Sequence, residues 1–223
     1  MAKPLISSKL VSAFATNAAR ISVASGALFA VLLLGLHVLE PEFDPTWRFV
    51  SEYMLGSFGW VMHLAFLALA TSLASAAVAI VSQVRGWYGY LGLAGLGFAA
   101  VGILIAAIFR TDPVTTARNA MTFSGNMHVF GASLDYTPVA ALLLSFALAR
   151  NQAWRPIRKR LFIAAGATLV VMVAFTAVLP YDGKFGPGVL AGLAGLAGRF
   201  LVLAYLLWLL PVGLHVIKLR SQS

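Results

Sequence analysis

Eight ionisable residues of this chain stand inside or at the ends of long apolar runs. In chain order they are Glu52, His63, Arg110, Asp112, His128, Asp135, Asp182 and Arg199. An ionisable side chain at membrane depth is costly unless it is paired, so it is a candidate functional residue by default. These eight residues therefore form the candidate site, and the remaining sequence must supply the elements that position them.

The spacing of these residues indicates two polar helical faces. If a helix runs from Ser51, its positions i, i+4, i+7 and i+11 are Glu52, Gly56, Gly59 and His63. In a second segment the same positions are Ser124, His128, Gly131 and Asp135. Residues at this spacing share one side of a helix. Each segment is therefore predicted to carry a polar face that is rich in small residues.

Two non-enzymatic interpretations fit these residue types. Opposed carboxylates and arginines with histidine between them suit the binding of a small molecule, a lipid headgroup or an ion. The alternative is structural: Arg199 pairs with an acid, and the pair pins the helix ends. The candidate acids for this pair are Asp135, Asp112 and Glu52.

A metal-dependent, hydrolase-like membrane enzyme is the competing class. Imidazole and carboxylate groups bind Zn²⁺, and the candidate ligands are His63, His128, Glu52 and Asp135. No His-Glu-x-x-His motif occurs, so only convergence in space would support a metal site. A b-type haem between His63 and His128 is the minor alternative. The expected cofactor is none, with a metal ion or haem as the alternatives, and the catalytic residues stay open.

The composition determines the elements that carry these residues. Hydrophobic residues make up 61% of the 223 positions, charged residues make up 10%, and the mean hydropathy is +0.90. A soluble domain has about a quarter charged residues, so the composition excludes a soluble, disordered or nucleic-acid-binding chain. A membrane-spanning helix needs roughly 20 apolar residues. Six runs meet this length: 21–39, 58–83, 88–109, 126–149, 160–180 and 189–217. The predicted fold is an all-α bundle of six transmembrane helices.

The distribution of charge predicts the orientation of the bundle. Sixteen Lys and Arg residues outnumber seven Asp and Glu residues. Most of the cations precede the first run, follow the sixth, or lie between the second and third or the fourth and fifth. Cytoplasmic loops carry the excess of Lys and Arg, so both termini are predicted to be cytoplasmic. All seven acids fall on the opposite half, together with His37, His63 and His128.

The chain divides into three parts on this basis. Residues 1–20 form a cytoplasmic segment, residues 21–217 form the transmembrane domain, and residues 218–223 form a tail. Residues 4–19 have the pattern of an amphipathic helix lying along the membrane surface. In the last run, one helical face carries Gly188, Gly192, Gly195 and Arg199. Small residues let helices approach closely, so Arg199 is predicted to point into the bundle.

Several short blocks occur together in this sequence: Val50-Ser51-Glu52, Gly59-Trp60-Val61-Met62, Phe109-Arg110-Thr111-Asp112-Pro113, Ser124-Gly125 with His128, and Gly195 with Arg199 and Trp208. In this combination the chain resembles the bacterial and archaeal membrane proteins grouped as domain of unknown function 998. The resemblance covers about residues 20–217.

The resemblance implies six helices and no established activity. With the charge pattern, it predicts a multi-pass protein of the bacterial cytoplasmic (inner) membrane. The expected partners are the lipid bilayer and, beyond it, a small molecule, a lipid or a partner membrane protein.

Overall fold

The computed structural model describes residues 11–184 and 192–222, and this part of the chain is helical. Its α-helices are α1 (Ala13–Leu39), α2 (Gly59–Ile80), α3 (Trp87–Ile108), α4 (Phe123–Ser133), α5 (Thr137–Ala149), α6 (Arg158–Ala177) and α7 (Ala194–Ser221). Short 3-10 helices lie between them, and no strand occurs in the described ranges. The predicted all-α class is confirmed.

Six segments are long and apolar enough to cross a membrane, with α4 and α5 together forming the fourth span. The chain is therefore a multi-pass membrane protein with six spans. The first helix is longer than predicted, because residues 13–19 form its first turns instead of a separate surface helix. The rest of that predicted helix, residues 4–10, lies outside the described residues. Gly188 and residues 189–191 of the predicted sixth run also lie outside them.

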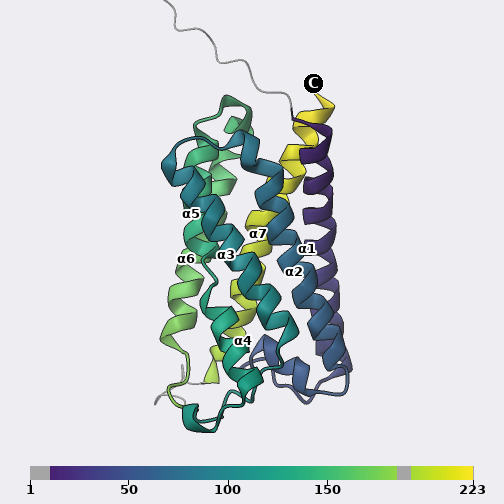
Figure 1. Cartoon of the computed structure of the whole chain (residues 1–223), viewed down its shortest axis with the longest axis vertical. Coiled ribbons are helices and arrows are strands. Elements are labelled where there is room, and N and C mark those ends of the chain that lie inside the picture. Colours follow the sequence, from purple (N-terminus) through teal and green to yellow (C-terminus); the bar gives the residue numbers. More distant parts are fainter. Residues whose placement is uncertain (1–10, 185–191, 223) are drawn as a thin grey trace, which may run out of the picture.

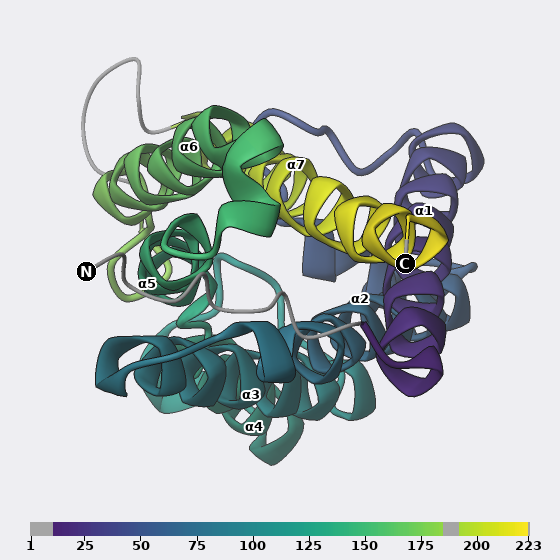
Figure 2. The ribbon, with the colours of Figure 1, turned by 90° about the horizontal axis from the view of Figure 1, so that it is seen from above.

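The six spans form a closed ring (Figures 1 and 2). Going round it, α1 packs on α2, α2 on α3, α3 on α4 and α5, α5 on α6, α6 on α7, and α7 on α1. We call the end that carries loops 40–58, 109–122 and 178–184 the acidic end, which is the lower end in Figure 1. The opposite end, with Arg85, Arg150 and the last turn of α7, is the basic end.

The fourth span is broken, which corrects the prediction of one continuous helix over 126–149. Helix α4 ends at Ser133 and α5 begins at Thr137. Pro138 stands at the start of α5, and in a continuous helix its ring would clash with the carbonyl of Leu134. The backbone of the break is satisfied locally, because the amide of Asp135 donates to the Ala132 carbonyl at 3.2 Å. Such irregular backbone is tolerated at membrane depth only when its polar groups find partners.

Helices α3 and α4 cross at a pair of glycines. A Cβ atom added to Gly131 would meet the carbonyl of Gly102 and, at 2.9 Å, the amide of Ala106. These neighbours are backbone atoms, which cannot rotate away. The crossing therefore requires Gly131, and it holds the last turn of α4 against α3.

Candidate functional site

The residues just before α2 belong to a separate short helix, so the first of the two predicted polar faces does not exist. A short 3-10 helix, η1 (Val50–Leu55), ends at Gly56, and α2 begins at Gly59. A Cβ atom on Gly59 would collide with the main chain of Met54, so this glycine lets η1 fold back against α2. The prediction that Glu52 and His63 share one helical face is therefore wrong.

Glu52 is fully buried and joins two loops. Its Oε2 accepts the main-chain N–H of Phe49 at 2.8 Å, and its Oε1 accepts the N–H of Val114 at 2.9 Å. The guanidinium of Arg48 lies 3.4 Å from Oε1. Because Val114 is 62 positions away in the chain, this one carboxylate ties the α1–α2 loop to the α3–α4 loop.

Two further carboxylates lie at helix starts. Glu40, which follows α1, accepts the N–H of Phe58 at 2.6 Å, directly before α2. Asp112 accepts both the N–H (2.7 Å) and the hydroxyl (2.9 Å) of Thr122, the residue that caps α4. The first N–H groups of a helix lack intrahelical partners and carry partial positive charge, so they favour a carboxylate.

Each of these two carboxylates packs against a glycine. Glu40 occupies the space that a Cβ atom on Gly56 would need, and Asp112 does the same at Gly125. The sequence analysis did not include Glu40 among the candidate residues, and the structure shows that its side chain is buried, with 1% exposed. The signal available for it was its position immediately after the first apolar run, since Asp112 similarly follows the third run, by three residues.

His63 and His128 bind the end of α3 from two sides. The Nδ1–H of His63 donates to the carbonyl of Ala107, and that of His128 donates to the carbonyl of Phe109 at 2.9 Å. The last carbonyls of a helix have no intrahelical donor. The two rings therefore satisfy carbonyls at the end of α3 from α2 and from α4.

Arg199 points into the bundle, as predicted, but its partners are not acids. Its Nε donates to Nε2 of His37 at 2.8 Å, and its Nη1 donates to the carbonyls of Arg48 (2.8 Å) and Gly195 (3.1 Å). Its Nη2 lies 3.3 Å from the hydroxyl of Tyr53. The expected pairing of Arg199 with Asp135, Asp112 or Glu52 is wrong. Those three carboxylates are held by other donors.

His37 is the partner that the sequence did not indicate. Its Nδ1 lies 2.7 Å from the carbonyl of Leu33, so Nδ1 carries the proton and Nε2 accepts from Arg199. A histidine at the end of an apolar run looks like an interfacial residue, and the sequence alone did not relate it to an arginine 162 positions later.

The remaining charged residues of the loops also form hydrogen bonds within or between the loops. Arg110 donates to the Leu55 carbonyl at 3.1 Å, and Asp182 accepts the N–H of Arg118 at 2.8 Å. Exposed Asp44 accepts the hydroxyl and N–H of Thr46, and these hydrogen bonds lower the pKa of its carboxyl. These contacts join the three loops to one another or fold a loop on itself.

Asp135 lies apart from the other candidates, at the break between α4 and α5. One oxygen accepts the N–H of Thr137 at 3.1 Å, and the other accepts the hydroxyl of Tyr205 from α7 at 2.6 Å. It lies beyond the last residue of α4, so its predicted place on one helical face with His128 is wrong. The second polar face is thus split by the same break that splits the span.

The predicted site is therefore three neighbourhoods rather than one cluster. Glu52, Arg110, Asp112 and the two histidines surround the end of α3 and the loops beside it, and Asp182 binds the α3–α4 loop there. Arg199 binds His37 and the α1–α2 loop, and Asp135 joins α5 to α7. Within residues 11–184 and 192–222, no group of three or more His, Asp or Glu side chains lies close enough to hold a metal ion.

Comparison with known proteins places the chain in a family. No curated protein and no solved structure matches it. The model of the family described as "protein of unknown function (DUF998)" matches residues 23–215, which include all or most of each span and every candidate residue above. The chain belongs to this family of membrane proteins of unknown function.

Proposed function

We propose that this chain is a non-enzymatic protein of the bacterial inner membrane whose acidic end faces outward. Its charged and imidazole side chains hold the loops of that end as one surface. The protein presents this surface to a partner membrane protein or another ligand and carries out no reaction there. The observation that carries the proposal is the position of Glu52, a buried carboxylate whose two oxygens are held by main-chain N–H groups of two different loops.

The way the other charges are engaged supports this proposal. Glu40 and Asp112 accept from helix starts, while His63, His128 and Arg199 donate to main-chain carbonyls. A site for a charged substrate would keep such groups directed at the ligand. Here the carboxylates accept main-chain N–H groups, and each of the two imidazoles donates to a main-chain carbonyl. Arg199 binds two carbonyls, His37 and Tyr53, so these groups are engaged within the protein.

Thermal unfolding in detergent tests the proposal with two matched variants. Glu52→Gln replaces an accepting oxygen by an amide that repels the donor N–H it faces, so the loss is on the order of 3 kcal/mol. We expect its Tm to fall by roughly 6 to 12 °C. Glu42→Gln, an exposed acid in the same loop, is the control and should keep the wild-type Tm. An unchanged Tm for Glu52→Gln would contradict the structural role.

The metal-dependent enzyme is the competing proposal, and one observation favours it. His63 and His128 both donate Nδ1–H to a main-chain carbonyl. Histidines that bind a metal through one ring nitrogen commonly donate the N–H of the other nitrogen in this way, which fixes the orientation of the ring. Elemental analysis of the purified protein beside the His63→Ala/His128→Ala double variant separates the two proposals. We expect equal zinc, iron and manganese in both samples. Near-stoichiometric metal that disappears in the double variant would overturn the non-enzymatic proposal.

A further inference from the structure

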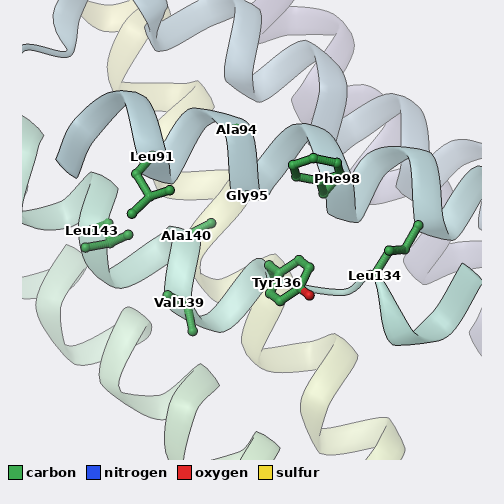
Figure 3. Close-up of a pocket in the computed structure, with 9 residues that line it drawn as sticks. All are labelled: Leu91, Ala94, Gly95, Phe98, Leu134, Tyr136, Val139, Ala140 and Leu143. Atoms are coloured by element: carbon green, nitrogen blue, oxygen red, sulfur yellow. The ribbon is translucent and has the colours of Figure 1, made fainter. Parts of the chain in front are cut away.

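A groove lies between α3 and α5 on the outer surface of the bundle (Figure 3). Its volume is about 370 Å³, at the small end of the range of ligand pockets, which is roughly 300–1,000 Å³. Leu91 and Leu143 lie at one end of it, and Phe98 and Tyr136 lie at the other. The Tyr136 hydroxyl is the polar side-chain group in a lining of otherwise apolar side chains.

The depth of the groove restricts what can enter it. It runs from Leu91 to Phe98, roughly 6 to 16 Å from the first residue of α3 at about 1.5 Å per residue. The hydrocarbon core of a bilayer is about 30 Å thick, so the groove extends from near one edge of the core to its middle. Its wall is open to the surroundings, because Val139 is 51% exposed. The molecules that reach this position are those dissolved in the bilayer.

Two exposed aromatic residues mark the level of the lipid headgroups at the basic end of the groove. Trp87 is 77% exposed and Tyr90 is 58% exposed, and both belong to the first turn of α3. Exposed Trp and Tyr at a helix end are typical of the membrane–water interface. A lipid whose chain fills the groove therefore has its headgroup beside the start of α3.

The charge at that position is positive and has no nearby acid to neutralise it. Arg150, which caps α5, reaches across to α3, where its guanidinium lies 4.9 Å from the centre of the Tyr88 ring. Arg85 precedes α3 by two residues and is exposed. No Asp or Glu occurs in residues 53–111 or 136–181. The two helices that form the groove thus carry uncompensated arginines at its mouth.

We propose that the groove holds one acyl chain of an anionic phospholipid whose headgroup lies against Arg150 and Arg85. The apolar lining accepts the chain, and the two guanidinium groups select the anionic headgroup over a zwitterionic one. This site is on the opposite half of the molecule from the loops of the proposed function, so either proposal can fail without the other.

Native mass spectrometry tests the proposal on the full chain after incubation with vesicles of equal phosphatidylglycerol and phosphatidylcholine. We expect the wild type to retain phosphatidylglycerol preferentially. Val139→Trp fills the groove and should lose the retained lipid. Val101→Trp is the matched control, because Val101 has the same 51% exposure, lies on α3 and does not line the groove. Arg150→Gln should reduce the preference for phosphatidylglycerol about fivefold while lipid binding persists.

Elution volume and Tm without added lipid show whether each variant folds. If Val139→Trp does not fold, Leu91→Trp fills the same groove from the other side. Equal retention by the groove-filled variant and the Val101→Trp control would overturn the acyl-chain site. Equal retention of the two lipids by the wild type, or an unchanged preference in Arg150→Gln, would overturn the role of the arginines.

Discussion

Arg199 donates to two main-chain carbonyls, an imidazole and a phenol, although a carboxylate is the usual partner for a buried guanidinium. Its planar group presents donors in several directions at once. Three of the five N–H groups are placed by His37, Arg48 and Gly195, which belong to α1, the α1–α2 loop and α7. The directions of these N–H groups thus let Arg199 connect α7 with α1 and with the α1–α2 loop. The positive charge alone does not explain the arrangement.

Replacement of Arg199 by lysine separates geometry from charge. Lysine keeps the positive charge but cannot donate in the same directions, so we expect Arg199→Lys to lose most of what Arg199→Ala loses. The expected cost is about 2 kcal/mol or more, which lowers Tm by roughly 4 to 8 °C in a chain of this size. Thermal unfolding in detergent measures it. A wild-type Tm for Arg199→Lys would show that the charge is sufficient and that an acid nearby, such as Asp44, is the real partner.

At the scale of elements, two helix connections are built alike. The carboxylate that follows α1 meets Gly56 before α2, and the carboxylate that follows α3 meets Gly125 at the start of α4. A histidine near the start of α2 and another near the start of α4 then donate to the end of α3. The two connections therefore repeat one arrangement of carboxylate, glycine and histidine at the helix ends.

The α3–α4 crossing gives an element-scale prediction. Gly131→Ala places a methyl group against backbone atoms of α3, so the helices must separate, at an expected cost of about 1–3 kcal/mol. Gly97→Ala is the matched control, since nothing lies within 4 Å of its Cβ position. Alanine favours a helix by roughly 1 kcal/mol over glycine, so this control should keep or raise Tm. Similar Tm values for the two variants would contradict the close crossing.

At the scale of the whole molecule, the separation of charge between the two ends predicts the orientation. The chain has no cysteine, so single cysteines can be introduced and labelled without a background. In intact cells, a membrane-impermeant maleimide should label Asn119→Cys at the acidic end and leave Gln222→Cys unlabelled until the membrane is opened. Labelling of Gln222→Cys alone would place the acidic end inside, against the positive-inside rule.

The fold was predictable from the sequence to a greater extent than the site. An apolar run of membrane length predicts a helix directly, because in lipid a helix forms the hydrogen bonds of its backbone N–H and C=O groups within itself. The break at Leu134–Tyr136 was missed, since the run stays apolar on both sides and only Pro138 indicates it. A proline that clashes with the preceding turn outweighs the continuity of hydropathy.

The partners within the site were not predictable, for a different physical reason. Glu52 accepts two main-chain N–H groups, and two of the four partners of Arg199 are main-chain carbonyls. Every residue has such groups, so the sequence does not show which of them a side chain will meet. The prediction that charges pair with opposite charges therefore failed for Arg199. Residue type correctly selected Glu52, His63 and His128 as buried or partly buried polar groups, but their partners depend on how the helix ends are arranged in space.

The central claim is that the Glu52 carboxylate joins two loops that are distant in the sequence. Hydrogen–deuterium exchange in the Glu52→Gln variant tests this claim most directly. In the wild type, the Val114 N–H is held by Glu52 and the Phe49 N–H by the same group. We expect Glu52→Gln to accelerate exchange in both peptides, residues 45–55 and residues 110–118, while Glu42→Gln leaves both unchanged. Accelerated exchange confined to residues 45–55, with 110–118 as protected as in the wild type, would contradict the account.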